Sequence, residues 1–394
     1  MKLVVLTTIM TPYLSPLFAE LDKRVDRFVA LLMAERSEDR HWDLAPSGFA
    51  SRVLPGLHFR PPGRSVSIHV NYRVIRTLRT LDPDVVVSGG FAPANIAALL
   101  YCKLFRKVFI GWGELTLQGE AESSRLRRLI RRGFGAWSDG AIASSGAARE
   151  AFRQYGVSED RILTTVMPVD VDHFHAVASA FRSTQEFEML RRRYRNPILI
   201  SVGQIIPRKG YRELFEIYRR LLEAGHKPSL LIFGEGPDRP YYERLARDLG
   251  WDHVHFHGFV SPEELPKWFA LGDVFIFHTL FDPFGAVLGE AMAAGLPVVS
   301  SIHAAATHEL VEDGVTGFCI DPREADASAA VIIKVLTLSL EERLAMGNAA
   351  YTKVRRYDPR TSAIAIVQFL TSVLNGVGRP LREGTENSPP VRHD

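Results

Sequence analysis

A basic turn in the second half of the chain has the residue types that bind a diphosphate. Gly203 and Gln204 follow an apolar run that predicts a strand, and Arg208 and Lys209 come shortly before a predicted helix. Glycine permits close approach of a ligand to the backbone, a helix start offers unpaired N–H groups, and the two cations can neutralise phosphate charge. A basic strand-to-helix loop without a ligand explains the turn as well, because it lacks the known Gly-rich nucleotide fingerprints.

Two carboxylates further along the chain could contact the rest of such a ligand. The pattern predicts Asp282 as the N-cap of a helix that begins at Pro283, and Glu290 lies within that helix. The spacing of about two turns would let the carboxylates touch different parts of one elongated ligand, such as a transferred sugar and a ribose. The alternative is that Asp282 only caps the helix and Glu290 is a solvated helix acid.

Other predicted strands end in weaker candidates. Gly234 and Gly236 follow a strand at the same end of the second sheet, where two glycines are often only a turn. Glu114 follows a first-half strand and is our candidate for binding a hydroxyl of a second ligand. Packing of Trp112 in the core beside an incidental acid explains that segment equally well.

The sequence predicts no metal site. Asp170 and Asp172 form an Asp-x-Asp pair, but it follows Pro168 where the domains connect. A diphosphate at the basic turn would already be balanced by Lys209, Arg208 and a helix terminus, so no metal is needed. Four histidines lack a third ligand at a convincing spacing, and we expect them to be ordinary polar side chains: His255, His257, His303 and His308.

Together, the motifs of the second half resemble glycosyltransferase family 4, a retaining family with the GT-B fold. The resemblance rests on Gly203–Gly210, Gly234–Pro237, Phe256–Val260 and Asp282–Val299. It covers most of residues 197–358 and extends more loosely through the first half, where Thr11–Phe18 is similar to a branch that makes bacterial surface polysaccharides. The resemblance implies transfer of a sugar from a nucleotide-diphosphate sugar, UDP- or GDP-linked, to a hydroxyl of a glycan or lipid-linked acceptor, with retention, in cell-surface polysaccharide or glycolipid synthesis.

The resemblance also implies roles for individual residues. Asp282 would hold sugar hydroxyls, Glu290 the ribose, and Lys209 with Arg208 the diphosphate. The base and the backbone contacts to sugar and phosphate would involve Phe259, Val260, Phe284, Gly285, Ala286 and Val287. The chain has Asp282 where the family usually has Glu, and Gln204 where it usually has Arg.

These two departures leave open a non-catalytic sugar-nucleotide-binding protein. A nicotinamide-dependent oxidoreductase is a further alternative, but its first turn should be Gly-rich, and residues 7–13 contain no glycine. No cofactor is expected, because the nucleotide sugar is a co-substrate.

The elements that must position these residues are two series of strands alternating with helices, which predicts two Rossmann-like doubly wound α/β domains facing a central cleft. The first series is Leu3–Leu6, Phe28–Leu32, Asp84–Val87, Val108–Ile110, Ala141–Ala143 and Ile162–Val166. The second is Ile198–Val202, Leu230–Phe233, Val254–Phe256, Val274–Phe277 and Val298–Ser300. We expect an acceptor-side domain over 1–172, a connection over 173–196, a donor-nucleotide domain over 197–357, a C-terminal helix over 358–375 that packs back on the first domain, and a mobile tail over 376–394.

Composition limits the other classes of function. The net charge of +3 is too small to indicate nucleic-acid binding, although residues 51–110 contain nine Lys or Arg and only two acids. Two distant cysteines fit a reduced, cytoplasmic protein. No apolar stretch approaches the roughly 20 residues that cross a bilayer.

A basic amphipathic segment predicts contact with an anionic membrane. Its five arginines are Arg125, Arg127, Arg128, Arg131 and Arg132. At helical spacing Leu126, Leu129, Ile130 and Phe134 share one face, so the helix could lie on the inner face of the plasma membrane. The alternative is a domain helix with its apolar stripe in the core.

Overall fold

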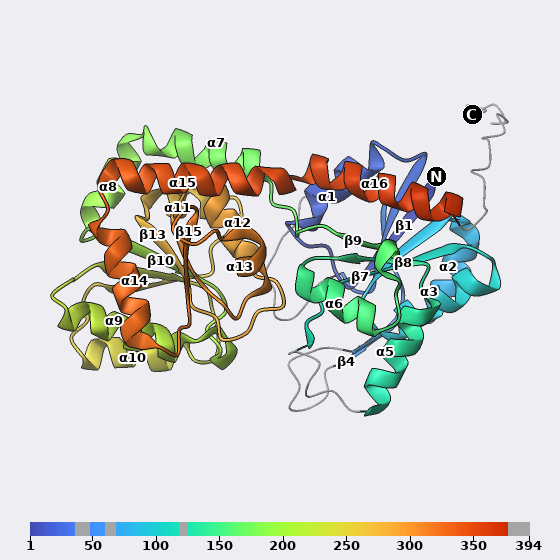
Figure 1. Cartoon of the computed structure of the whole chain (residues 1–394), viewed down its shortest axis with the longest axis horizontal. Coiled ribbons are helices and arrows are strands. Elements are labelled where there is room, and N and C mark those ends of the chain that lie inside the picture. Colours follow the sequence, from blue (N-terminus) through green and yellow to red (C-terminus); the bar gives the residue numbers. More distant parts are fainter. Residues whose placement is uncertain (36–47, 60–67, 118–124, 377–394) are drawn as a thin grey trace, which may run out of the picture.

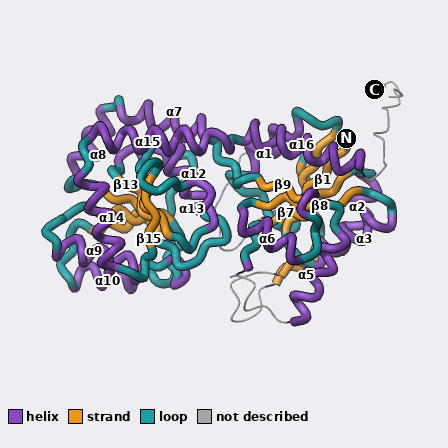
Figure 2. Tube along the Cα trace, viewed as in Figure 1, coloured by secondary structure: helices purple, strands orange, loops and turns teal. Residues whose placement is uncertain are grey.

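The chain folds around two parallel β-sheets, each covered by helices. The computed structural model describes residues 1–35, 48–59, 68–117 and 125–376. One α/β half is built from the first part of the sequence and the other from the second, and helices α15 and α16 run along one side of both (Figure 1). In each half the strands lie inside and the helices outside (Figure 2). The predicted α/β class with two Rossmann-like domains is confirmed.

The first sheet has seven parallel strands in the order β3-β2-β1-β6-β7-β8-β9. Its strands are β1 (Lys2–Thr7), β2 (Arg27–Leu32), β3 (Ser51–Val53), β6 (Val85–Gly89), β7 (Val108–Gly113), β8 (Gly140–Ala143) and β9 (Ile162–Thr164), and a separate antiparallel pair is β4 (Leu57–Phe59) with β5 (Ile68–Val70). Its helices are α1 (Leu14–Asp22), α2 (Val74–Leu81), α3 (Pro93–Leu104), α5 (Arg125–Trp137) and α6 (Gly146–Gln154). Central strands are buried along most of their length, which explains their near-continuous apolar runs.

The second sheet has six parallel strands in the order β12-β11-β10-β13-β14-β15. They are β10 (Ile198–Val202), β11 (Ser229–Phe233), β12 (Val254–Gly258), β13 (Val274–Phe277), β14 (Val298–Ser301) and β15 (Gly317–Ile320). The helices that follow or cover them are α9 (Tyr211–Glu223), α10 (Arg239–Asp248), α11 (Leu265–Leu271), α12 (Ala286–Ala293), α13 (Ala305–Leu310), α14 (Ala325–Thr337) and α15 (Leu340–Val354).

Both sheets contain a topological switch point. Numbered within its own half, each sheet has the order 3-2-1-4-5-6, with a seventh strand added in the first. Successive strands are added on one side and then on the other, so the connections after strands 1 and 4 leave the sheet in opposite directions. Ligands of such sheets bind beyond the carboxyl ends of these two strands. In the second half they are β10 and β13.

Two segments between and after the sheets join the cores. Helices α7 (Val171–Arg182) and α8 (Gln185–Arg193) occupy the stretch expected to connect the domains, and α7 packs on α11 and α12 of the second half. The last helix, α16 (Pro359–Gly376), packs on α1, and its Ile366 and Leu370 lie in the core of the first half. The expected tail lies outside the described residues beyond Gly376.

Candidate functional site

The turn after β10 packs tightly against the segment that follows β13. Gly210 has a left-handed φ of 75°, and a Cβ there would lie 2.3 Å from the carbonyl oxygen of His278. The carbonyl of Arg208 accepts hydrogen bonds from the N–H groups of Leu280 (3.0 Å) and Phe281 (3.2 Å). The two loops therefore pack backbone against backbone at the switch point, and only glycine fits at position 210.

This packing brings Lys209, a predicted cation, next to Asp282, a predicted carboxylate. The Nζ of Lys209 forms an ion pair with Oδ2 of Asp282, and their side chains are 14% and 12% exposed. The Nζ also lies 5.5 Å from the ring centre of Phe277. The Arg208 guanidinium, anchored on the carbonyl of Phe281 at 3.0 Å, is the second cation of the turn. Two cations and a carboxylate that can contact a phosphate and a sugar are thus adjacent at the carboxyl ends of β10 and β13.

The predicted helix start is wrong. Helix α12 begins at Ala286, after Gly285 with a left-handed φ of 100°, and Asp282 is not its N-cap. Asp282 is extended and forms an isolated parallel bridge with Ala304, which follows β14. An Asp-Pro pair often begins a helix, but here pairing with the neighbouring loop keeps the backbone extended and moves the helix start beyond Gly285. Asp282 and Glu290 are therefore not on one helix.

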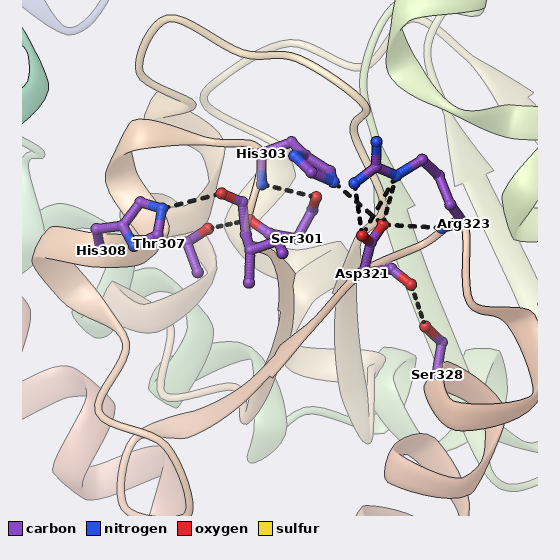
Figure 3. Close-up of polar contacts among 8 residues, drawn as sticks. Ser301, His303, Thr307, His308, Asp321, Arg323 and Ser328 are labelled. Carbon is purple, nitrogen blue, oxygen red and sulfur yellow. Dashed lines mark hydrogen bonds and ion pairs between the residues drawn. The ribbon is translucent and has the colours of Figure 1, made fainter.

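A network on the neighbouring loop fixes the backbone of Asp282. Its N–H donates to the carbonyl of His303 at 3.1 Å, and Ser301 Oγ accepts the N–H of His303 at 3.1 Å. The imidazole of His303 contacts Asp321 at 3.1 Å, and Asp321 is paired with Arg323 at 2.6 Å (Figure 3). Hydrogen bonding from Arg323 holds the pKa of the Asp321 carboxyl well below its usual range. The loop that orients Asp282 is therefore anchored by charge-assisted bonds.

Three of the four histidines considered in the sequence contact other groups of the protein. His303 points to Asp321, whereas His308 contacts the carbonyl of Ile302 at 2.9 Å (Figure 3). His257 stacks on Phe233, and burial lowers its pKa to about 4. Within the described ranges, no three His, Cys, Asp or Glu side chains are grouped to hold a metal ion.

The glycines after β11 have a packing role. A Cβ on Gly234 would lie 2.0 Å from the carbonyl oxygen of Gly203, and one on Gly236 would lie 2.2 Å from that of Ile205. Ile205 N–H donates to the carbonyl of Glu235 at 2.9 Å. These glycines therefore let the second turn lie directly against the first. Whether they also contact a ligand stays a prediction, as does any role of the exposed Gln204.

Glu290 lies about one turn into α12 and is partly buried. No hydrogen bond or ion pair to its carboxyl occurs within the described part of the chain, and burial raises its pKa to about 7. A partly buried carboxyl with a raised pKa is a candidate for a ligand contact. Nearby, the N–H of Phe284 donates to Oδ1 of Asp282 at 3.2 Å, so that amide is already engaged. Ala286 and Val287 begin the helix.

Three predicted residues follow other strands. Phe259 and Val260 follow β12, the edge strand next to β11, and Val260 packs on the second-half core. Glu114 follows β7 of the first sheet, while Trp112 packs on the first-half core. Their contacts with a base or an acceptor stay predictions.

Sequence reasoning missed the polar groups beneath the site. Ser201 and His278 are buried at the ends of β10 and β13, and the Tyr211 hydroxyl donates to the carbonyl of Gly203 at 3.0 Å. The signal was present, because Ser201 and His278 interrupt or end otherwise apolar runs, and buried polar groups are hydrogen-bonded.

No described helix is long and apolar enough to cross a bilayer.

Residues 183–353 match the model of the family described as Glycosyl transferases group 1. The chain is 32% identical over 216 residues to the GDP-mannose-dependent alpha-(1-6)-phosphatidylinositol monomannoside mannosyltransferase of Mycobacterium tuberculosis, covering 51% of this chain and 54% of that protein. It is 33% identical over 174 residues to alpha-D-kanosaminyltransferase of Streptomyces kanamyceticus, covering 43% and 44%. The chain thus spans about half the length of these curated relatives.

Solved structures match over nearly the whole chain. Anabaena Alr3699/HepE in complex with UDP has a TM-score of 0.73 at 20% identity, covering 94% of this chain and all of that one. Sucrose-phosphate synthase from Thermosynechococcus elongatus has a TM-score of 0.71 at 16% identity, covering 95% and 100%. The chain therefore has the two-domain GT-B fold of these proteins, and its residues 183–353 match the family Glycosyl transferases group 1.

Proposed function

We propose that this chain is a glycosyltransferase that moves a sugar from a UDP- or GDP-sugar to a hydroxyl of a glycan or lipid-linked acceptor. The observation that carries the proposal is the pairing of Lys209 with Asp282 at the second-half switch point, with Arg208 beside them. Diphosphate needs cations and free N–H groups, and a sugar needs a carboxylate at hydrogen-bond distance. This site has two cations and a carboxylate, and backbone hydrogen bonds between the loops that carry them fix those loops in advance.

In the proposed reaction, the acceptor oxygen forms a bond to the anomeric carbon while the bond from that carbon to the phosphate oxygen breaks. The acceptor proton passes to the departing phosphate oxygen. Lys209 and Arg208 stabilise the negative charge that develops on the leaving nucleoside diphosphate, because preorganised cations act most strongly where charge appears in the transition state. Asp282 orients the sugar, and Glu290 accepts hydrogen bonds from the ribose. Glu114 is the candidate for orienting the acceptor hydroxyl.

We further propose membership of glycosyltransferase family 4, with retention of anomeric configuration by front-face attack, in the synthesis of surface polysaccharide or glycolipid. The match over residues 183–353 supports the assignment, as do relatives named as mannosyl- and kanosaminyltransferases. A relative named as acting on phosphatidylinositol monomannoside favours a lipid-linked acceptor.

Release of nucleotide from a panel of UDP- and GDP-sugars tests the proposal. One sugar nucleotide should raise the melting temperature and be cleaved slowly to free UDP or GDP in water. A Lys209→Ala variant should lose both effects. Thermal stabilisation without any release, even with glycan and lipid-linked acceptors added, would favour the non-catalytic binding protein, and no stabilisation by any member would contradict the proposal.

The first half offers a surface for an anionic membrane. On α5, Leu126 and Leu129 are each 67% exposed and Ile130 is 44% exposed, so the apolar stripe is not in the core at this end. At the far end of the helix, Phe134 is buried, and the guanidinium of Arg131 lies 4.8 Å from the ring centre of Phe91. Such a helix can insert its apolar side chains among lipids while its arginines contact headgroups. We propose that it holds the enzyme at the cytoplasmic face of the plasma membrane.

Co-sedimentation with vesicles tests the membrane proposal. Binding should require phosphatidylglycerol, weaken as salt rises, and fall when Arg125, Arg128 and Arg132 are changed to Gln. Arg131 is left unchanged because it packs on the protein. The matched control changes three exposed second-half residues to Gln, namely Arg192, Arg193 and Arg195. Equal loss in both variants, or equal binding to phosphatidylcholine vesicles, would contradict a specific role of α5.

A further inference from the structure

The side chain of His278 bridges the two strands of the second-half switch point. Pairing of β10 with β13 covers only Leu199 with Val274 and Ile200 with Phe275, so the strands separate before their carboxyl ends. His278 follows β13 directly, and its Nε2 lies 2.8 Å from Oγ of Ser201 on β10. A side-chain contact therefore continues where the backbone ladder stops.

The other ring nitrogen of His278 reaches the basic turn. Nδ1 lies 3.0 Å from the carbonyl oxygen of Gly210. Because a carbonyl can only accept, Nδ1 must carry the proton, and in the neutral imidazole Nε2 then accepts from the hydroxyl of Ser201. The imidazole is buried, which lowers its pKa to about 4 and keeps this neutral form at ordinary pH. The chemistry of its partners thus fixes both its tautomer and its orientation.

A second side chain braces the opposite end of the same turn. The buried ring of Tyr211 packs edge-on against His278, with ring centres 4.8 Å apart, and its hydroxyl donates to the carbonyl of Gly203 at 3.0 Å. The turn is therefore fixed at Gly203 and at Gly210. Lys209 lies between these points, next to the one that His278 holds.

We propose that His278 is a positioning residue that sets the place of Lys209 through the Gly210 carbonyl, with Ser201 fixing the ring. The inference rests on the proposed function, since it concerns how the turn is preorganised for a nucleoside diphosphate. His278 touches no ligand in this role. It holds the cation where the diphosphate arrives, so that binding does not have to order the turn.

Three variants test this role, with UDP and GDP as the probes in calorimetry. His278→Leu removes both hydrogen bonds and should weaken the binding of whichever nucleotide the parent binds by about tenfold. His278→Asn keeps a donor at the position of Nδ1 and should retain affinity within about threefold. Val274→Ala, at the other end of β13, opens a cavity in the core and should lower stability without changing affinity.

A readout without ligand separates this inference from the proposed function. Trypsin should cleave after Arg208 and Lys209 faster in His278→Leu than in the parent or in Val274→Ala, because a released turn opens locally more often. Unchanged affinity and unchanged cleavage in folded His278→Leu would overturn the inference, as would affinity losses that follow stability alone across all variants. A parent that binds neither UDP nor GDP would instead contradict the proposed function, and the cleavage pattern would still report whether His278 braces the turn.

Discussion

The two halves share one strand order but differ in the loops at their switch points. In the second half these loops contain Arg208, Lys209 and Asp282, and they are joined by backbone hydrogen bonds. In the first half, residues 8–13 and 90–93 contain no Lys, Arg, Asp or Glu. Tyr13 instead packs against the cores of both halves. The same topology thus presents charged loops in one half and an uncharged contact surface in the other. We propose that this difference in loop composition, rather than the fold, assigns phosphate binding to the second half.

The largest effect should come from removing the cation of the charged switch point. Lys209→Ala should lower the rate of sugar transfer or of nucleotide release about 100-fold, as loss of a preorganised electrostatic group does. The matched control is Lys227→Ala, an exposed lysine before β11 at the opposite end of the strands. Steady-state rates on the sugar nucleotide that stabilises the parent provide the measurement. Similar rates for Lys209→Ala and the control would contradict the proposal that the second-half switch point binds the diphosphate.

Asp282→Asn should lower the rate of sugar transfer without weakening nucleotide binding. The change removes a carboxylate that would hold the sugar and also releases Lys209 from its ion pair, so transfer should fall about tenfold while UDP or GDP binds as tightly as before or tighter. Loss of the charged hydrogen bond should lower the free energy of unfolding by about 1.5 to 3 kcal/mol. Denaturant titration measures the free energy of unfolding, calorimetry measures nucleotide affinity, and steady-state rates measure transfer. An affinity loss as large as the transfer loss would place Asp282 against the diphosphate instead.

Glu290→Gln should weaken UDP or GDP binding by about 1.5 to 3 kcal/mol at pH 8, because a charged hydrogen bond to the ribose is lost. Burial raises the pKa of Glu290 to about 7, so the parent is protonated below that pH and should then bind about as weakly as the variant. Parent affinity should therefore rise with pH through about 7. A pH profile as steep in Glu290→Gln as in the parent would exclude Glu290 as its cause.

The raised pKa of Glu290 also makes the stability of the protein depend on pH. Because the pKa is raised in the folded state, folding favours the protonated carboxyl, and the contribution of Glu290 is lost as the pH rises from about 4.5 to about 7. The parent should lose free energy of unfolding over this window relative to Glu290→Gln. Denaturant midpoints at several pH values measure the difference.

The smallest effect should come from the uncharged switch point. Thr8→Ala, at an exposed position after β1, should change UDP or GDP affinity by less than about twofold, since a neutral hydroxyl contributes little to phosphate binding. A loss comparable to that of Lys209→Ala would show that the first half holds the diphosphate too.

The sequence predicted the strands of both sheets well where they are buried on both faces. It missed β15 and the short β3, β4 and β5, whose few residues give little periodic signal. The resemblance to glycosyltransferase family 4 implied that Lys209 and Asp282 belong to one site, and the structure pairs their side chains. The sequence could not predict that Asp282 bridges to Ala304 rather than capping a helix, since that depends on a loop distant in sequence. Nor could it predict the bond from His278 to Gly210.

Hydrogen exchange of the full chain with and without saturating UDP or GDP tests the central claim most directly. The account predicts slower exchange in residues 203–210 and 278–290 when nucleotide is present, with no comparable change in residues 7–13 or 89–93. It predicts that Lys209→Ala abolishes this protection at the same nucleotide concentration, while Lys227→Ala does not. Protection confined to the first-half loops, or none with either nucleotide, would contradict a donor site built on the second-half switch point.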